Sequence, residues 1–217
     1  TCVINPTVGK ERVYQIKPVE KAKKVVVVGG GPAGMQAAVV AAKRGHKVTL
    51  FERNANLGGQ LNIAALPPFK GDIFPWINYL VNQVRKAGVD VKLNTDATTE
   101  IVAEENPDIV VVATGGIPVM PDIPGIDKPN VVTAQDVLSG KTKTGQNVVI
   151  IGGGMVGCET GHYLAKQGKR VTIIEILKRM ANDMFPMARR RLMDGLKSKN
   201  VTLLTSATCK EIGEGIV

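Results

Sequence analysis

Apolar and polar positions along this chain follow two alternating patterns, one typical of buried parallel strands and one typical of helices. Apolar runs at residues 25–28 and 148–151 are each followed by a glycine-rich turn, a stretch of small residues and a second run rich in β-branched side chains. Short continuous apolar runs bounded by turns indicate strands covered on both faces, and their alternation with helical stretches indicates βαβ units. The patterning therefore predicts the α/β class.

The same reading predicts further elements along the chain. Ile73, Ile77, Leu80 and Val84 recur at helical spacing and predict an amphipathic helix. Residues 1–22 have no clear period and are expected to form an arm or linker. The other expected elements are strands at 24–28, 47–52, 89–94, 108–115, 201–204 and 208–212, helices at 32–44 and 185–199, a loop at 54–71 and an irregular, proline-rich crossing segment at 117–145.

A glycine fingerprint, G-x-G-x-x-G, occurs twice, each time between an apolar run and a helical stretch. The fingerprint glycines are Gly29, Gly31 and Gly34, and then Gly152, Gly154 and Gly157. In each copy a glutamate follows the first glycine by 23 residues: Glu52 (52 minus 29) and Glu175 (175 minus 152). A glycine-rich turn alone can bind nothing, but the strand, helix and acid in register predict two dinucleotide sites.

The chemistry of a dinucleotide explains this spacing. The first glycine allows a tight turn, the second lets a pyrophosphate approach the backbone, and the third lets helix and strand pack closely. The phosphates then lie on free N–H groups at the positive end of the helix. Pro32 costs little there because its missing N–H has no partner within the helix. Each glutamate can accept hydrogen bonds from ribose hydroxyls.

The two motifs belong to an internal repeat. Val25–Arg53 aligns with Val148–Ile176 without a gap, and twelve of the 29 positions are identical. Gly45 and Gly168 follow Lys-Arg and Lys-Gln at matching positions, a pattern typical of helix C-caps. The repeat predicts one βαβ module used twice.

Composition and charge narrow the function classes. The formal charge is +9, from 28 basic and 19 acidic residues, but the basic residues are dispersed and only 4% of residues are aromatic. Nucleic-acid binding, which uses basic stripes with stacking aromatics, is therefore disfavoured, whereas a positive field favours anionic dinucleotides. No apolar stretch approaches the roughly 20 residues of a membrane span, and three scattered cysteines form no disulfide framework. We expect a cytoplasmic protein without membrane partners.

Together these features resemble the flavoproteins with two dinucleotide-binding domains. The resemblance is carried by the first fingerprint with Glu52, by residues 58–61 (Gly-Gly-Gln-Leu), by residues 113–115 (Ala-Thr-Gly), and by the second fingerprint with Glu159 and Glu175. It implies two Rossmann-like domains, the second inserted in the first. We expect an arm at 1–22, part of an FAD-binding domain at 23–116, a crossing segment at 117–145 and an incomplete NAD(P)H-binding domain at 146–217. The family's late Gly-Asp motif has no counterpart, so the domains are expected to be truncated.

The resemblance also implies site residues. Those expected to bind FAD are Gly29, Gly31, Pro32, Ala33, Gly34, Glu52, Arg53, Gly59, Gln60, Ala113, Thr114 and Gly115. Those expected to bind NADH are Gly152, Gly154, Met155, Val156, Gly157 and Glu175. Glu159 is the candidate catalytic residue near the nicotinamide, and the alternative is an acid of the first helical turn favoured by the helix dipole.

The N-terminal arm resembles a segment of the old-yellow-enzyme-like iron–sulfur flavoenzymes, such as 2,4-dienoyl-CoA reductase and 2-enoate reductase. There a cysteine shortly before Asn-Pro, as Cys2 precedes Asn5-Pro6 here, is the last ligand of a [4Fe–4S] cluster. The resemblance implies a preceding FMN-bearing barrel and reduction of an activated C=C bond. The alternative for Cys2 is a surface thiol. No C-x-x-C or C-x₄-C pair is present, so dithiol chemistry is not expected.

Two functions follow as hypotheses. In the first, the chain is an oxidoreductase module that passes hydride from NADH to FAD and feeds the iron–sulfur and FMN centres of a parent enzyme. In the second, it is a structural domain that holds ADP without redox chemistry. The 217-residue stretch alone is expected to bind FAD poorly and to be inactive, and its exposed sheet edges favour association with a second copy.

Overall fold

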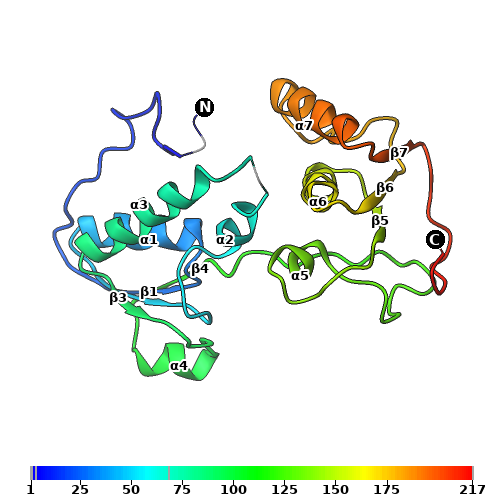
Figure 1. Ribbon diagram of the computed structural model, residues 1–217. Coiled ribbons are helices and arrows are strands. Elements are labelled where there is room, and N and C mark those ends of the chain that lie inside the picture. The colour runs from blue at the N-terminus through cyan, green and yellow to red at the C-terminus, as the bar shows by residue number, and fades with distance from the viewer. Residues whose placement is uncertain (1, 3, 68, 217) are drawn as a thin grey trace. The chain divides into compact units, whose positions relative to one another are not determined.

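The computed structural model describes residues 2, 4–67 and 69–216, which fold into two compact units (Figure 1). Unit 1 contains the chain up to residue 65 together with residues 70–116. Unit 2 contains residues 66–69 and the chain from residue 117 onward. Each unit holds one copy of the repeat and one parallel sheet, which confirms the predicted α/β class.

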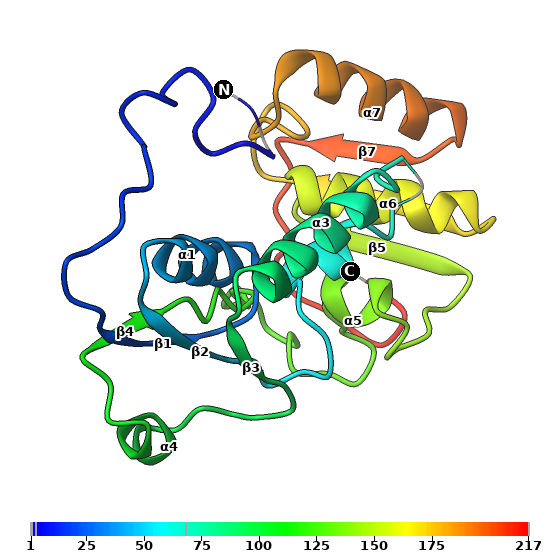
Figure 2. The same cartoon turned by 90° about the vertical axis from the view of Figure 1, so that its left-hand side faces the viewer.

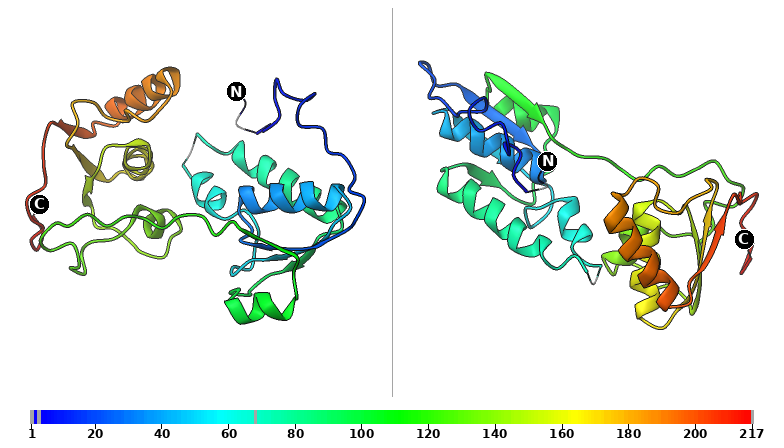
Figure 3. Two further views of the ribbon diagram at one scale, coloured as in Figure 1. Left: turned by 180° about the vertical axis from the view of Figure 1, so that it is seen from behind. Right: turned by 90° about the horizontal axis from the view of Figure 1, so that it is seen from above.

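Unit 1 is a four-stranded parallel sheet in the order β3-β2-β1-β4. Val25 of the central strand pairs with Val48 on one side and with Ile109 on the other. Helices α1 and α3 lie on one side of this sheet and α4 on the other (Figures 1 and 3). In chain order the elements are β1 (Lys24–Val28), α1 (Pro32–Lys43), β2 (Lys47–Phe51), α2 (Gln60–Ala64), α3 (Ile73–Lys86), β3 (Asp90–Lys92), α4 (Thr99–Glu104) and β4 (Ile109–Val112).

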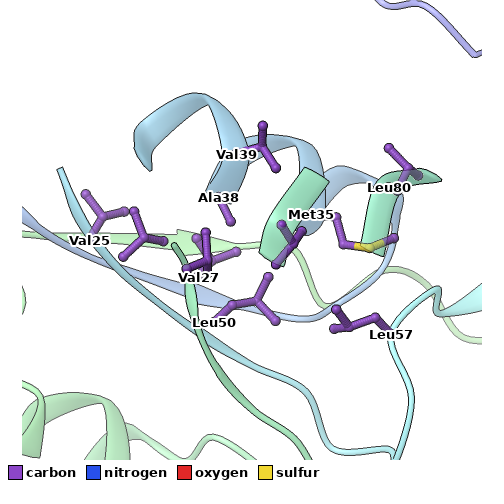
Figure 4. Packing of buried hydrophobic residues seen from close by; sticks show 11 residues of the cluster. Val25, Val27, Met35, Ala38, Val39, Leu50, Leu57 and Leu80 are labelled. Carbon is purple, nitrogen blue, oxygen red and sulfur yellow. The ribbon is translucent and has the colours of Figure 1, made fainter. Parts of the chain in front are cut away.

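The core of unit 1 lies between this sheet and its helices. Met35 and Ala38 of α1 are fully buried and face Val27 and Leu50, which are also fully buried (Figure 4). Full burial of one such aliphatic side chain contributes roughly 1.5–3 kcal/mol. Leu80, from the predicted amphipathic helix, joins the same cluster, so the helical spacing read from the sequence identifies the buried face of α3. The carboxyl ends of the strands are thereby held in fixed positions.

Unit 2 is a three-stranded parallel sheet in the order β5-β6-β7. Helix α6 packs against the sheet and against α7 (Figure 2). Cys158, Ile173 and Leu196, from α6, β6 and α7, are fully buried and form the centre of its core. The elements are α5 (Ala134–Leu138), β5 (Asn147–Ile151), α6 (Met155–Lys166), β6 (Arg170–Glu175), α7 (Pro186–Ser198) and β7 (Thr202–Thr205).

Apolar side chains on parts of both sheets are open to solvent. Val112 on the edge strand β4 is 74% exposed, and Val149 on the edge strand β5 is 42% exposed. Parallel sheets are normally covered on both faces, so this exposure departs from the usual burial of such sheets.

Three short helices were not expected, and two of them are capped by a threonine side chain. Helix α5 falls within the supposedly irregular crossing segment, where Thr133 accepts a hydrogen bond from Asp136 N–H at 3.1 Å and donates to its carboxylate at 2.7 Å. Thr133-x-x-Asp136 matches the sequence pattern of a capping box, a signal that could have located this helix. Helix α4 is likewise capped by Thr98, which accepts from Ile101 N–H at 3.4 Å. Helix α2 begins within the expected loop, directly after Gly59.

The strand expected at 208–212 is wrong. Ile212 N–H donates to Pro124 carbonyl oxygen at 2.8 Å, but residues 207–213 form no strand. Proline has no N–H to return a second ladder bond, so a regular pair cannot form at this position. Cys209 therefore lies outside any strand and is partly exposed, whereas Cys158 is fully buried in the core of unit 2.

Candidate functional site

The first fingerprint forms the turn between β1 and α1. Gly29 adopts φ +107°, in the left-handed region that favours glycine. A Cβ at Gly29 would meet the carbonyl oxygen of Ala113, and one at Gly34 would meet that of Gly29. Glycine is therefore required at the first and third fingerprint positions by close backbone packing.

The second fingerprint position is open. Among the described residues, no atom lies within 4 Å of the position that a Cβ on Gly31 would occupy. Gly31 has an ordinary φ of −71°, so backbone conformation does not demand glycine there. The open space at this position, next to the N-terminus of α1, fits a pyrophosphate.

Glu52 lies directly after β2 and is only 5% exposed. Its Oε2 accepts a hydrogen bond from the N–H of Gly30 at 2.7 Å. Its Oε1 accepts from Asn54, at 2.8 Å from the backbone N–H and 2.6 Å from the side-chain amide. Three donors thus fix the carboxylate against the fingerprint turn, ready to accept from a ribose hydroxyl on its remaining lone pairs.

An open hollow lies at the carboxyl ends of the unit 1 strands, with about 390 Å³ of space that includes open solvent. In open α/β sheets, ligands bind at this edge. It brings together four predicted site residues with five that were not predicted, and three of these five, Thr95, Asp96 and Ala97, lie in the loop after β3. The residues that line it are Val28, Gly29, Phe51, Glu52, Arg53, Thr95, Asp96, Ala97 and Thr114.

The other predicted residues of this site lie around the same turn. Gly59 packs on the fingerprint so closely that a Cβ there would lie 2.9 Å from Cα of Gly31. Gln60 donates its side-chain amide to the carbonyl oxygen of Gly116 at 2.8 Å. Ala33, in the first turn of α1, is exposed, as is Gly115, which adopts φ +77°.

The second fingerprint repeats this geometry in unit 2. Gly152 adopts φ +101°, and a Cβ on Gly157 would meet the carbonyl oxygen of Gly152. Glu175 is 8% exposed, and its Oε2 accepts from the N–H of Gly153 at 2.7 Å. Its Oε1 accepts from the N–H of Leu177, also at 2.7 Å. Glu175 is therefore held against its glycine turn in the same way as Glu52.

The repeat extends past the region that aligns by sequence. Gly58 donates its N–H to the carbonyl oxygen of Gly30 at 2.9 Å, and Ala181 donates to that of Gly153 at 2.6 Å. The two donors are 123 positions apart in the chain (181 minus 58), and so are the two acceptors (153 minus 30). The alignment ended at Ile176 because the segments beyond it share little sequence, although their backbones make the same contact.

Helix α6 carries three buried groups with chemical potential. Glu159 is its fifth residue and is 5% exposed, so the alternative of a first-turn acid is wrong. The thiol of Cys158 donates to Gly153 carbonyl oxygen at 3.2 Å, and burial raises the pKa of Cys158 to about 11. His162 stacks on Phe69 with ring centroids 5.3 Å apart. Burial, and then Lys166 and Lys199, lower the pKa of His162.

Two findings concern metals and membranes. Cys2 is a free, partly exposed cysteine, and within residues 2, 4–67 and 69–216 no three or more His, Cys, Asp or Glu side chains form a group that could hold a metal ion. Among the helices in this part of the chain, none combines the length and apolar character needed to cross a membrane.

Two parallel α/β units, each with a glycine turn before a helix and a buried glutamate at its strand ends, define a protein with two dinucleotide-binding domains. The family described as pyridine nucleotide-disulphide oxidoreductase matches residues 23–215, and the chain belongs to this family of oxidoreductases. The redox cysteine pair that the family's description suggests is not present as C-x-x-C or C-x₄-C in this sequence.

Individual relatives are similar over nearly the whole chain. An NADH oxidase of Thermoanaerobacter brockii is 47% identical over 216 residues, which cover 97% of this chain and 33% of that protein. A cinnamate reductase of Clostridium sporogenes is 42% identical, covering all of this chain and 33% of the relative. A solved complex of 2-naphthoyl-CoA reductase with 2-naphthoyl-CoA superimposes with a TM-score of 0.95 at 40% identity, covering 98% and 33% respectively. The chain thus spans about a third of the length of these relatives.

Sequence reasoning missed Asn54, Asp183 and residues 95–97 in the loop after β3. The parallel sheet could have indicated residues 95–97, because the loop that follows β3 begins at the same edge of the sheet as Glu52. Asn54 and Asp183 belong to no sequence motif. Asn54 donates to Glu52 and Asp183 accepts from Met155, and each hydrogen bond forms only when its loop is folded.

Proposed function

We propose that this chain is the FAD- and NADH-binding module of a flavin-dependent oxidoreductase, with FAD in unit 1 and NADH in unit 2. The observation that supports the first assignment is the hollow at Glu52, which lies beside the open turn at Gly31. The bound flavin supplies the redox chemistry, accepting hydride from the reduced nicotinamide. The residues of the chain bind, orient and shield the two cofactors.

In unit 1, the amides at the start of α1 hold the pyrophosphate, and Glu52 accepts from the ribose of the ADP half. Arg53 and residues 95–97 form the remaining wall of the hollow around this half. In unit 2, Glu175 faces the adenosine ribose of NADH and disfavours a 2′-phosphate by charge repulsion. Glu159 is the candidate residue nearest the nicotinamide.

For the protein as a whole, we propose transfer of electrons through a [4Fe–4S] cluster to FMN on a barrel domain, where an activated C=C bond is reduced. Relatives named as a cinnamate reductase and a 2-naphthoyl-CoA reductase support this substrate class. A cluster of this kind needs four thiolates, of which this stretch would supply one, Cys2. The cytoplasm is the proposed compartment.

The alternative of a structural ADP-binding domain is not favoured, because both repeats keep their glutamate and the relatives are named as oxidases and reductases. Flavin released from the purified full-length protein by denaturation tests the proposal. It should contain FAD in addition to FMN, and FMN alone would contradict it.

Cys2→Ala tests the cluster assignment. The variant should lose iron and sulfide from the full-length protein, whereas Cys209→Ala, the matched change at another partly exposed thiol, should keep both. A cluster that survives Cys2→Ala would overturn this part of the proposal. The 217-residue stretch alone is proposed to hold FAD weakly, and stoichiometric, tightly bound FAD would contradict that.

A further inference from the structure

The N-terminus of α6 is covered by a carboxylate of the chain itself. The backbone N–H of Met155, the first residue of α6, donates to both oxygens of Asp183, at 2.9 Å to Oδ1 and 3.1 Å to Oδ2. The atoms nearest to a Cβ built on Gly154 are those of the same carboxyl group, with Oδ2 at 3.5 Å. A negative group therefore lies where the second fingerprint glycine leaves room for a phosphate.

Unit 1 differs at each equivalent position. Pro32 corresponds to Met155 (155 minus 32 is 123) and has no N–H to donate. Gln60 corresponds to Asp183 (183 minus 60 is 123), is neutral, and donates to Gly116 instead. The space at Gly31 is open among the described residues. The phosphate-binding turn is thus free in unit 1 and covered by an anion in unit 2.

Asp183 can leave this position without unfolding its loop. The loop is anchored at Ala181, which is fully buried and donates to Gly153 at 2.6 Å, and at Met180, whose carbonyl oxygen accepts from Arg189 Nε at 2.7 Å. Asp183 itself lies beyond this anchor and is exposed. Rotation about its own side-chain bonds would move the carboxylate into solvent while the anchor stays in place.

We propose that Asp183 is an internal competitor for the pyrophosphate of NADH at the second fingerprint, so that this site binds its dinucleotide more weakly and exchanges it. This inference rests on the proposed function of unit 2. The helix N-terminus attracts one negative group within its first turn, and a second negative group beside it is repelled. Binding must therefore displace the carboxylate, and the apparent affinity falls by the fraction of molecules in which the turn is open. Asp183 determines affinity and takes no part in hydride transfer.

Calorimetric titration of the intact protein with NADH and, separately, with adenosine tests this role. Asp183→Asn should lower the Kd for NADH about twofold to fivefold, the range typical of one charge at a helix N-terminus. The Kd for adenosine should stay unchanged, because adenosine carries no pyrophosphate. Without nucleotide the melting temperature of the variant should fall, since α6 loses its capping charge. Asp194→Asn, at an exposed acid of α7, is the matched control and should change none of these values.

The outcomes separate the inference from the function on which it rests. If wild-type protein binds NADH but Asp183→Asn binds it equally or less tightly, the competitor role is wrong and the NADH site stands. If Asp194→Asn tightens binding as much, the effect belongs to overall charge, and the role of Asp183 is again wrong. If neither wild type nor variant binds NADH, the proposed function of unit 2 fails and the inference fails with it.

Discussion

The backbone N–H of Gly30 donates a 2.7 Å hydrogen bond to Oε2 of Glu52, and this one contact joins the two ends of the first dinucleotide motif. Gly153 and Glu175 repeat it at the same distance, 123 positions later in the chain. The glutamate therefore has two roles in each unit, since it holds the glycine turn in shape and offers its remaining acceptor capacity to a ribose.

Glu52→Ala should weaken FAD binding. The change removes a charge-assisted hydrogen bond to the ribose, worth roughly 1.5–3 kcal/mol, and leaves the buried N–H of Gly30 without its acceptor. Equilibrium dialysis of the full-length protein with FAD measures the loss. Glu100→Gln, at an exposed acid of α4, should bind FAD as wild type does. Equal FAD affinity in Glu52→Ala and wild type would refute the role of Glu52.

Gly31→Ala and Gly34→Ala should separate binding from folding. A Cβ at Gly31 meets no described atom within 4 Å, so the folded chain should tolerate it while the pyrophosphate is excluded. A Cβ at Gly34 would meet the carbonyl oxygen of Gly29, so that variant should lose stability as well. Melting temperature and FAD content distinguish the two. A Gly31→Ala protein that keeps its FAD would show that the phosphate does not approach this glycine.

NADH should be preferred over NADPH. Glu175 is buried against Gly153 and would lie beside a 2′-phosphate that it repels, although Lys178 and Arg179 close by reduce the effect. Steady-state kcat/KM for the two cofactors measures the preference, and Glu175→Gln should narrow it without changing Vmax for NADH greatly. Equal or better use of NADPH by the wild type would contradict this assignment.

His162 should make unit 2 less stable in acid. Burial lowers the pKa of His162, so between its unfolded pKa of about 6.5 and its lower folded pKa only the unfolded chain binds the proton. The contribution of neutral His162 to the free energy of unfolding is therefore fully present above about pH 6.5 and declines as the pH falls below that value. His162→Phe, which can keep the stack on Phe69, should flatten the loss seen in melting temperatures measured from neutral to acid pH. An unchanged slope in His162→Phe would exclude this histidine as the cause.

Sequence reasoning identified the parts of this chain that repeat a strong local pattern. The strand ends, the positive-φ glycines and both buried glutamates follow from the fingerprint, because close backbone packing permits few other residues at those positions. Residues 95–97 and Asp183 could not be found in this way. Each reaches its site through the course of a loop, and loop geometry depends on tertiary contacts such as the hydrogen bond from Ala181 to Gly153.

The short helices and the missing strand also could not be predicted from the local sequence. The capping box at Thr133 was readable, but a five-residue helix has no apolar period to support it. The expected strand at 208–212 had the right composition, yet its neighbour Pro124 cannot donate the hydrogen bond that a ladder requires. Composition therefore predicted a strand that cannot form a regular ladder with the segment at Pro124.

The most direct test of the central claim is to mix the full-length protein rapidly with NADH without oxygen and to record the reduction of its bound FAD. Wild-type protein should show fast bleaching of FAD, Glu52→Ala should contain less FAD to be reduced, and Glu175→Ala should keep its FAD but need more NADH for the half-maximal rate. FAD that is not reduced by NADH, or a concentration dependence unchanged in Glu175→Ala, would contradict the assignment of FAD to the first fingerprint and NADH to the second.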